Sequence, residues 1–492
     1  MPEYQPGRWL IDAVVHHEQG TAGLSCVMTI RDRFTGQAAA ELGQSKPLLL
    51  PAPRVITVDE SRRSVANISS IGVELVGFDD EIDFERLAAH LRRSIRQSSA
   101  GSGLRVRVGS LPDEGKLPAS LTEAQRDGAY LLDVDTQGIS IAADSLSGVY
   151  LAARTLAQIL DQYSCDPTSK AASIPFLSIT DWPEFAVRGV MLDVSRDRVP
   201  TMAEFRSIIE SLASIKINHL QLYTEHTFAY TAHPKVWQGW SPLTPGEIRE
   251  LDAHCQLLGI ELVANQNCFG HLAHWLRMPE YAHLAETQGD WMFDVWPRSG
   301  PFSLCPTDPR SIEFVDGLLA ELMPCFGSNL INIGADETYD IAYGRSKDEV
   351  AKRGRATVYL DFVQQICDRV KARGGRPMFW ADIALHEPAC IPRIPAELIS
   401  LAWGYEPDSP FESWVNALSA AGREVWVCPG TSSWRSITGR TSEARGNMLA
   451  AARAGAGGKA DGYLLCDWGD TGHHQQWPVT VNAIGMGAAI AW

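Results

Sequence analysis

The stretch LINIGADETYD (330–340) joins a short apolar run to two adjacent acids, Asp336 and Glu337. Eight such runs recur after residue 187, and seven of them are followed by a helical pattern. The runs are RGVMLDV (188–194), HLQLYT (219–224), ELVANQN (261–267), LINIGADE (330–337), PMFWADI (377–383), LISLAWGY (398–405), EVWVCPG (424–430) and GYLLCDWGD (462–470). Eight strands joined by crossover helices are typical of a (β/α)8 barrel. The sequence therefore predicts an α/β fold with a TIM barrel over residues 181–492.

Residues 1–180 follow another pattern. LRVRVGSL (104–111) and GAYLLDVDTQGISIAA (128–143) indicate strands, while ERLAAHLRRSIRQ (85–97) and LSGVYLAARTLAQILDQY (146–163) indicate helices. Strands and helices that do not alternate regularly favour a small α+β domain in front of the barrel. The first 45 residues or so predict a separate lead-in strand pair.

Composition excludes several classes of partner. The chain has 43 Lys and Arg against 59 Asp and Glu, a net charge of −16, which argues against nucleic acid and anionic membranes. No apolar stretch reaches the roughly 18 residues of a spanning helix, and MPEYQPGRWLIDAVVHHEQG (1–20) lacks the pattern of a signal peptide. The ten cysteines form no C-x-x-C pair, so we expect buried reduced thiols in a cytoplasmic protein.

No cofactor or metal is predicted. A phosphate-binding glycine loop is absent, and the adjacent His473 and His474 would not share a helix face as a metal pair would. The last helical pattern, VTVNAIGMGAAIAW (479–492), ends on Trp492. An exposed apolar end is unusual, so we expect the natural chain to continue.

The active site of such a barrel lies at the carboxyl ends of its strands. The residues there form an acidic, tryptophan-rich set with one arginine: Asp193, Arg196, Glu225, Asn267, His271, Asp336, Glu337, Trp380, Asp382, Trp403, Tyr405, Trp434, Trp468 and Asp470. Carboxylates and arginine bind sugar hydroxyls, and flat indole rings stack on the apolar face of a sugar. A single tryptophan could equally belong to the core, but Trp380, Trp403 and Trp468 stand at corresponding strand ends. The set therefore predicts a sugar site.

The Asp336–Glu337 pair is the sharpest local feature. Two carboxylates on a pocket floor repel, so one pKa rises and the other falls. A glycosidase needs that split, with one group protonated to donate to the leaving oxygen and one ionised. Neighbours in a regular strand point to opposite faces, so both acids serve one pocket only if the strand ends there, and Gly334 permits the tight backbone.

Several segments in the correct order resemble one family. RGVMLDVSRDRVP (188–200), SIKINHLQLYTEHTF (214–228), CFGH (268–271), INIGADE (331–337), FWAD (379–382) and CDWGD (466–470) resemble the catalytic domain of the family 20 glycoside hydrolases, the β-N-acetylhexosaminidases. Residues 129–160 resemble the small α/β domain that precedes the barrel in that family. The resemblance runs from roughly residue 120 to 490.

The resemblance implies an exo-acting, retaining enzyme that releases terminal β-GlcNAc or β-GalNAc from a small molecule or oligosaccharide. In this family the substrate's own 2-acetamido oxygen attacks the anomeric carbon and forms an oxazolinium ion, an exception to the two-carboxylate scheme. Glu337 would be the general acid and base, and Asp336 would orient the acetamide. The implied sugar-binding and supporting residues are Arg196, Glu225, His271, Trp380, Asp382, Trp403, Tyr405, Trp434, Trp468 and Asp470.

The roles within that set are also implied. Arg196 would bind the 3- and 4-hydroxyls, and Asp470 the 4- and 6-hydroxyls. Glu225 and His271 would form a carboxylate–histidine pair that supports Glu337. The three strand-end tryptophans would wall the acetamide pocket and floor the sugar ring.

The sequence departs from the family pattern at several positions. Asp197 replaces the usual histidine, Glu225 a usual Asp, and Asp470 a usual Glu. The loop CPGTSSWRS (428–436) lacks the tyrosine that bonds the acetamide carbonyl, and Trp434 or Tyr405 would have to substitute. These changes indicate a divergent branch.

Two alternatives remain open. The missing tyrosine and the shorter Asp470 are compatible with a catalytically inactive glycan-binding protein on the same fold. A barrel glycosidase for sugars without an acetamido group would instead need a protein nucleophile, with about 5 Å between its carboxyl groups.

Overall fold

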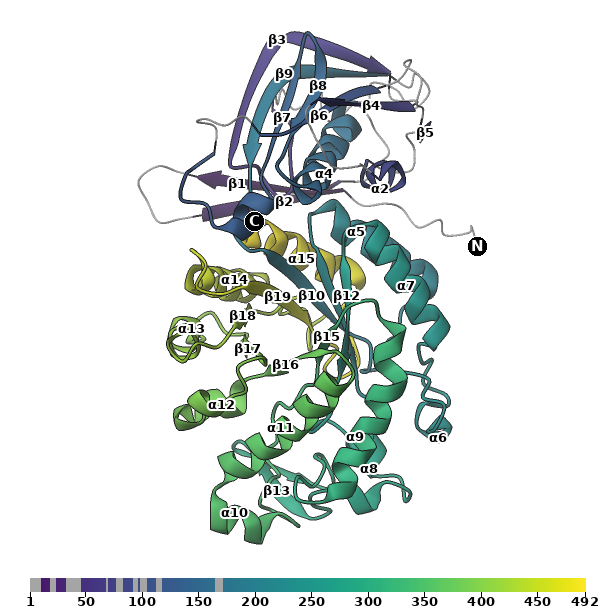
Figure 1. The fold of residues 1–492 in the computed structure, drawn as a ribbon, viewed down its shortest axis with the longest axis vertical. Coiled ribbons are helices and arrows are strands. Elements are labelled where there is room, and N and C mark those ends of the chain that lie inside the picture. The colour runs from purple at the N-terminus through teal and green to yellow at the C-terminus, as the bar shows by residue number, and fades with distance from the viewer. Residues whose placement is uncertain are drawn as a thin grey trace.

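The computed structural model describes residues 10–17, 24–31, 46–67, 70–76, 83–91, 96–97, 104–111, 117–163 and 171–492. A mixed sheet lies at one end of the molecule and a barrel at the other, and the C-terminal helix lies between them (Figure 1). The barrel follows the sheet in the chain after a connection of a few residues, from Asp181 to Val187.

The N-terminal sheet has seven strands. In spatial order they are β3 (Val55–Asn67), β9 (Ala171–Asp181), β7 (Tyr130–Asp135), β8 (Gly138–Ala142), β6 (Leu104–Gly109), β4 (Ser70–Val76) and β5 (Arg96–Gln97). Helix α4 (Leu146–Tyr163) packs its apolar stripe on this sheet. The short helix α3 (Glu123–Asp127) begins with a capping box at Thr122. The expected lead-in strand pair is present as β1 (Leu10–His17) and β2 (Leu24–Arg31), which pair antiparallel.

The predicted helix at 85–97 is wrong at its C-terminal end. Helix α2 covers only Phe84–His90, and Arg96–Gln97 form β5 instead. This strand pairs in parallel with the start of β4. Pairing with a free sheet edge has outweighed the local helical pattern.

Eight parallel strands close into a barrel, as predicted. They are β10 (Val187–Asp193), β11 (His219–Thr224), β12 (Glu261–Gln266), β15 (Leu330–Asn332), β16 (Arg376–Trp380), β17 (Ile399–Trp403), β18 (Val425–Cys428) and β19 (Gly462–Asp467). Each falls within one of the eight apolar runs or at most one residue outside it. The fold class is therefore confirmed: a TIM barrel preceded by a smaller α+β unit.

Helices cover the outside of the barrel. They are α5 (Met202–Ser214), α6 (Pro234–Trp237), α7 (Pro245–Leu257), α9 (Pro309–Leu322), α10 (Lys347–Arg353), α11 (Arg355–Ala372), α12 (Asp382–His386), α13 (Phe411–Ala420), α14 (Thr441–Gly455) and α15 (Trp477–Ala491), with 3-10 turns η2 (Met323–Cys325) and η3 (Pro388–Arg393). The proline-rich connection between β16 and β17 forms only α12 and η3. Capping boxes at Thr201 and Thr244 begin α5 and α7.

The connection after β12 is long and carries its own structure. It holds α8 (Ala273–Leu276), the turn η1 (Ala282–Leu284) and a hairpin of β13 (Asp290–Phe293) and β14 (Trp296–Ser299). Because it follows a strand's carboxyl end, it belongs to the face of the barrel that carries active sites. The hairpin and α10 lie at the end of the molecule remote from the N-terminal sheet (Figure 1).

The side chain of Trp492 is buried. Its side chain belongs to the core of the N-terminal sheet, and its indole N–H donates to Asp181 Oδ1 at 2.8 Å. The ammonium of Lys216 lies 3.8 Å from the indole centroid, and the Arg188 guanidinium lies 5.0 Å from it. Polar partners for the indole N–H and its π face explain why this site accepts a tryptophan.

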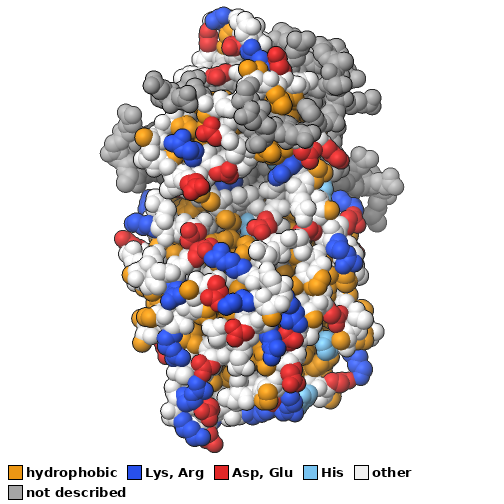
Figure 2. Space-filling view, viewed as in Figure 1, with side chains coloured by type: hydrophobic (Ala, Val, Ile, Leu, Met, Phe, Trp, Pro, Cys, Tyr) orange, Lys and Arg blue, Asp and Glu red, His pale blue; other side chains and the backbone are white. Residues whose placement is uncertain are grey.

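The surface carries charges of both signs. On the face drawn in Figure 2, acidic and basic side chains are interspersed over the barrel. The eight cysteines from Cys255 to Cys466 are free and buried, as expected for these residues. No helix in those ranges combines the length and apolar character needed to cross a membrane.

Candidate active site

The two adjacent acids follow the shortest strand of the barrel. β15 ends at Asn332, so Asp336 and Glu337 lie beyond the regular strand, as a shared pocket requires. Gly334, Ala335 and Glu337 have positive φ angles of 70°, 71° and 53°. Two of the hydrogen bonds that hold this turn come from other segments: the Tyr359 hydroxyl donates to Ala335 O at 2.9 Å, and the Glu337 N–H donates to Asp382 Oδ2 at 3.0 Å.

Replacing Gly334 with Ala should impair both stability and catalysis. A Cβ there would lie 2.4 Å from Asn267 Oδ1, and Asn267 Nδ2 donates to Asp336 Oδ1 at 3.0 Å. We expect the positive φ to cost about 1–2 kcal/mol of unfolding free energy, with a further loss of kcat as Asn267 moves. Gly374→Ala is the matched control, since Gly374 has φ +76° and open space around it. Equal effects of the two variants on kcat and Tm would contradict the role given to Asn267.

His271 lies between the two acids. Its Nε2 is 3.2 Å from Asp336 Oδ2 and 3.2 Å from Glu337 Oε2. On the other side of the ring, Nδ1 is 3.8 Å from Glu225 Oε1. The structure therefore brings together the carboxylate–histidine pair and the acid pair that the sequence analysis named.

Neighbouring charges raise the pKa of His271 and lower the pKa of Asp336. Burial alone would lower the pKa of His271, but the charges and hydrogen bonds of Asp336 and Glu337 outweigh it and hold the pKa well above its usual value. Burial alone would raise the pKa of Asp336, but His271 and the Asn267 amide outweigh it and lower that pKa. Imidazolium and carboxylate stabilise each other.

This group of atoms also has the spacing of a cation site. One ligand atom each from His271, Asp336 and Glu337 lie within 4.8 Å of one another. A metal binds the neutral imidazole, and Asp336 and Glu337 raise the pKa of His271. A cation at this place would therefore have to compete with the imidazole proton.

The raised pKa of His271 makes a pH-dependent contribution to stability. Because the folded chain binds this proton more tightly than the unfolded chain, the stabilisation is complete below the ordinary pKa of about 6.5. It is lost as pH rises through the raised folded pKa. We expect the Tm gap between wild type and His271→Asn to be largest below about pH 6.5 and to narrow with rising pH. The exposed His283→Asn should show no such trend, and a pH-independent gap for His271→Asn would contradict the assignment.

Asp382 is the carboxyl beside Asp336 whose pKa rises. Burial raises the pKa of Asp382 well above its usual value, and the charge of Asp336 raises it further. Its Oδ1 accepts from Trp403 Nε1 at 3.4 Å. The sequence predicts a separation of carboxyl pKa values between Asp336 and Glu337, whereas in the structure the opposite shifts fall on Asp336 and Asp382, which lie on neighbouring barrel segments.

Arg196 joins the site from β10. Its guanidinium bonds Asp193 Oδ2 at 2.8 Å and lies 3.2 Å from Glu225 Oε1 and 3.8 Å from Asp470 Oδ1. Burial alone would lower the pKa of Arg196, but the charge of Asp193 and its other neighbours raise it well above the usual value. A permanently charged, partly exposed donor at the barrel mouth suits hydroxyl recognition.

Aromatic rings form the other side of the site. The Trp380 and Trp468 centroids lie 6.0 Å apart, Trp403 stacks on Tyr405 at 5.2 Å, and Trp434 meets Tyr405 edge-on at 5.0 Å. The Trp468 indole N–H donates to the Tyr405 hydroxyl at 2.7 Å. The structure therefore brings all five predicted rings into one continuous group, with the Tyr405 hydroxyl inside it.

Sequence reasoning missed three aromatic residues here. The Tyr223 hydroxyl donates to Glu225 Oε1 at 2.9 Å, and the Arg196 guanidinium lies 5.1 Å from its ring. Two-residue periodicity along β11 could have found Tyr223, since it points to the same face as Glu225. Phe302 packs on His271 at 4.7 Å, and Tyr339 follows Glu337 by two residues. Both belong to irregular loops, where no periodic signal exists.

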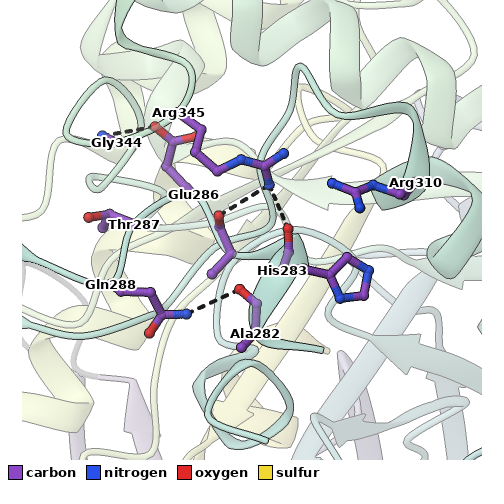
Figure 3. A pocket seen from close by; sticks show the side chains of 9 residues that line it. Ala282, His283, Glu286, Thr287, Gln288, Arg310, Gly344 and Arg345 are labelled. Atoms are coloured by element: carbon purple, nitrogen blue, oxygen red, sulfur yellow. Dashed lines mark hydrogen bonds between the residues drawn. The ribbon is translucent and has the colours of Figure 1, made fainter. Parts of the chain in front are cut away.

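A separate hollow of about 500 Å³ lies beside the loop after β12 (Figure 3). Its polar groups already bond one another. Arg345 Nη1 donates to His283 O at 2.7 Å, Gly344 N–H donates to Glu286 Oε1 at 3.1 Å, and Arg310 pairs with Asp308. These bonds hold the loop in place, so we assign the hollow a structural role.

Paired acids, an arginine and a group of aromatic side chains at the mouth of a TIM barrel are typical of glycoside hydrolases. The family model "Glycosyl hydrolase family 20, catalytic domain" matches residues 185–434, and "Glycosyl hydrolase family 20, domain 2" matches residues 46–182. The chain therefore belongs to glycosyl hydrolase family 20, as its motifs predicted.

Curated relatives carry hexosaminidase names. "Beta-hexosaminidase subunit beta" of Entamoeba histolytica is 26% identical over 279 residues, which cover 52% of this chain and 48% of that protein. "Beta-hexosaminidase" of Vibrio furnissii is 27% identical over 240 residues, covering 44% and 38%. The chain spans about half the length of the curated relatives it matches.

Solved structures share the fold over nearly the whole chain. The Streptomyces plicatus N-acetyl-β-hexosaminidase, in complex with Thio-NAglucal, matches with a TM-score of 0.67 and 19% identity, covering 91% of this chain and 92% of that one. An exo-β-N-acetylglucosaminidase of Vibrio harveyi, in complex with N-acetylglucosamine, matches with a TM-score of 0.69 and 19% identity, covering 90% and 73%. At this identity the likeness supports the fold.

Proposed function

We propose that this protein is an exo-acting β-N-acetylhexosaminidase that removes a terminal β-linked N-acetylhexosamine from a glycan or glycoconjugate. One observation carries the proposal. His271 Nε2 lies 3.2 Å from both Asp336 and Glu337, and five aromatic rings form one group at the neighbouring strand ends. The hexosaminidase names of the relatives and the N-acetylglucosamine bound to the Vibrio harveyi protein support the choice of sugar.

The proposed reaction is substrate-assisted. The acetamido carbonyl oxygen attacks the anomeric carbon while Glu337 gives its proton to the glycosidic oxygen, and the bond to the leaving group breaks. Water then attacks the oxazolinium ion at the anomeric carbon, and Glu337 takes a proton from it. Two inversions give net retention of configuration.

Asp336 suits the second role in this reaction. Its lowered pKa keeps it ionised, so it accepts the acetamide N–H and stabilises the positive charge that develops on the ring. A preorganised charge in a buried site is worth more than the same charge in water. The Tyr405 hydroxyl, inside the aromatic group, is our candidate for the missing acetamide-binding tyrosine, with Trp434 behind it.

The test is hydrolysis of p-nitrophenyl β-GlcNAc and β-GalNAc, with p-nitrophenyl β-glucoside as the control. We expect turnover of an N-acetyl sugar and none of the glucoside, because the glucoside lacks the internal nucleophile. Turnover of the glucoside at a similar rate would overturn the substrate-assisted mechanism. Binding of the N-acetyl sugars by calorimetry without turnover of any substrate would instead favour a glycan-binding protein.

A cytoplasmic location is part of the proposal. It is supported by the free, buried state of the eight cysteines from Cys255 to Cys466, which is common where thiols stay reduced. Fractionation of the source cells with an antibody to the chain would test it.

A further inference from the structure

The β13–β14 hairpin presents apolar side chains to solvent at the active-site end of the barrel. Val295 and Trp296 are each 67% exposed and Met292 is 38% exposed, and Tyr343 on the next loop is 48% exposed. Exposed large apolar side chains that gather in one place are typical of a surface that a ligand or partner covers. The hairpin turn itself is tight, with Asp294 at φ +53°.

One face of this hairpin packs on the loop that carries Glu337. Phe293 and Trp296 are cross-strand partners, so their side chains share a face. The Phe293 ring lies 5.2 Å from Tyr339, and Tyr339 follows Glu337 by two residues. Trp296 is therefore on the hairpin face that packs toward the Glu337 loop.

Further contacts fix the hairpin relative to the site. Phe293 and Trp291 lie 5.9 and 5.2 Å from Phe302, and Phe302 packs on His271 at 4.7 Å. Burial raises the pKa of Tyr339, and the charges of Asp382, Glu337 and Asp294 raise it further. The tip of the hairpin thus lies on the same side of the site as Glu337.

That side is where a leaving group must pass. A general acid lies beside the glycosidic oxygen that it protonates, so whatever is attached to that oxygen extends past Glu337. On this side of the site, Tyr339 contacts Phe293, and Phe293 pairs across the hairpin with Trp296, whose indole is exposed. Arg298, whose guanidinium lies 5.4 Å from the Phe293 ring, and Asp294 add polar groups at the edge of this surface.

We propose that Trp296, supported by Phe293 and Tyr339, is a stacking platform for a leaving group with a flat apolar face. The shared chemistry fits a second sugar ring or an aryl ring. The inference rests on the proposed function, because it extends that site to the leaving-group side. It makes Trp296 a specificity-determining residue.

The test uses calorimetry in a Glu337→Gln background, which keeps the ligand intact. Three ligands are compared: methyl β-N-acetylglucosaminide, phenyl β-N-acetylglucosaminide and the β-1,4 disaccharide of N-acetylglucosamine. We expect Trp296→Ala to weaken binding of the ring-bearing ligands about threefold to tenfold, the range of an aromatic stacking contact, and to leave the methyl glycoside nearly unchanged. A loss confined to the disaccharide assigns the platform to sugar, and one confined to the phenyl glycoside assigns it to aryl groups.

Two further variants control the interpretation. Trp296→Phe keeps a flat ring and should retain most of the affinity. Trp240→Ala removes another exposed tryptophan, one that packs on His226 and His274, and should not discriminate among the ligands. If Trp296→Ala binds all three ligands as tightly as its Glu337→Gln parent, the role proposed for Trp296 is wrong and the proposed function stands. If the Glu337→Gln protein binds none of the three ligands, the proposed function is wrong as well.

Discussion

Replacing Glu337 with Gln should lower kcat for an N-acetylglucosaminide by about 10²–10⁴-fold, the usual contribution of a positioned general acid. Glutamine keeps the size of the side chain and can still bond His271, but it has no proton to give to the glycosidic oxygen. Because a p-nitrophenolate leaves without much protonation, the loss should be smaller for that aglycone than for a methyl glycoside. Steady-state kinetics on both substrates measure this difference.

The matched control is Glu412→Gln on the outer helix α13, where Glu412 is exposed. It should leave kcat and KM unchanged. Both variants should melt close to wild type, since Glu337 is also partly exposed. Full activity of Glu337→Gln, or an equal loss for the two leaving groups, would contradict the general-acid assignment.

Replacing Lys216 with Met should destabilise the fold by about 3–5 kcal/mol, the cost of removing one partner of a buried ion pair. Lys216 Nζ lies 3.0 Å from Asp181 Oδ2 and 2.9 Å from the Tyr130 hydroxyl, and both members of the pair are buried. Burial lowers the pKa of Lys216, and the charge of Asp181 opposes that effect. Without the ammonium, the Asp181 carboxylate remains buried with only neutral donors.

The free energy of unfolding of three variants, measured by chemical denaturation, tests whether the unpaired Asp181 carboxylate causes the loss of stability. Lys216→Met/Asp181→Asn should recover only part of the loss, because the unpaired carboxylate is gone but the buried Arg188 guanidinium also loses the charge of Asp181. Lys235→Met removes an exposed lysine paired with Glu280 and should change stability little, since exposed pairs contribute little. A double variant less stable than Lys216→Met would show that packing, rather than the unpaired carboxylate, explains the loss.

The barrel was predictable because its signals are periodic. Each strand is an apolar run buried on both faces, and reading the carboxyl end of every run led to Arg196, Glu225, His271 and the acid pair. The same rule placed Trp380 and Trp468 in one group. These side chains needed only strand order and strand direction, both of which a continuous apolar pattern carries.

Two kinds of feature could not be predicted from the sequence: the geometry of irregular backbone, and contacts between residues that are far apart in the chain. The proximity of Asp382 to Asp336 depends on where two neighbouring segments leave their strands. The hairpin that carries Trp296 has no consistent alternation of apolar and polar residues. The burial of Trp492 depends on Asp181 and Lys216, which are far away in sequence. Such positions are set by three-dimensional packing, which overrides local pattern.

The backbone of the acid pair has an evolutionary consequence. Ala335 and Glu337 keep left-handed conformations that cost a non-glycine residue about 1–2 kcal/mol each, and bonds from Tyr359 and to Asp382 enforce them. Selection for heat resistance alone would favour glycine at these positions and would relax the turn that aims the carboxyls. Laboratory evolution of this protein should therefore find its gains in robustness elsewhere, while this turn stays as a local weakness that activity requires.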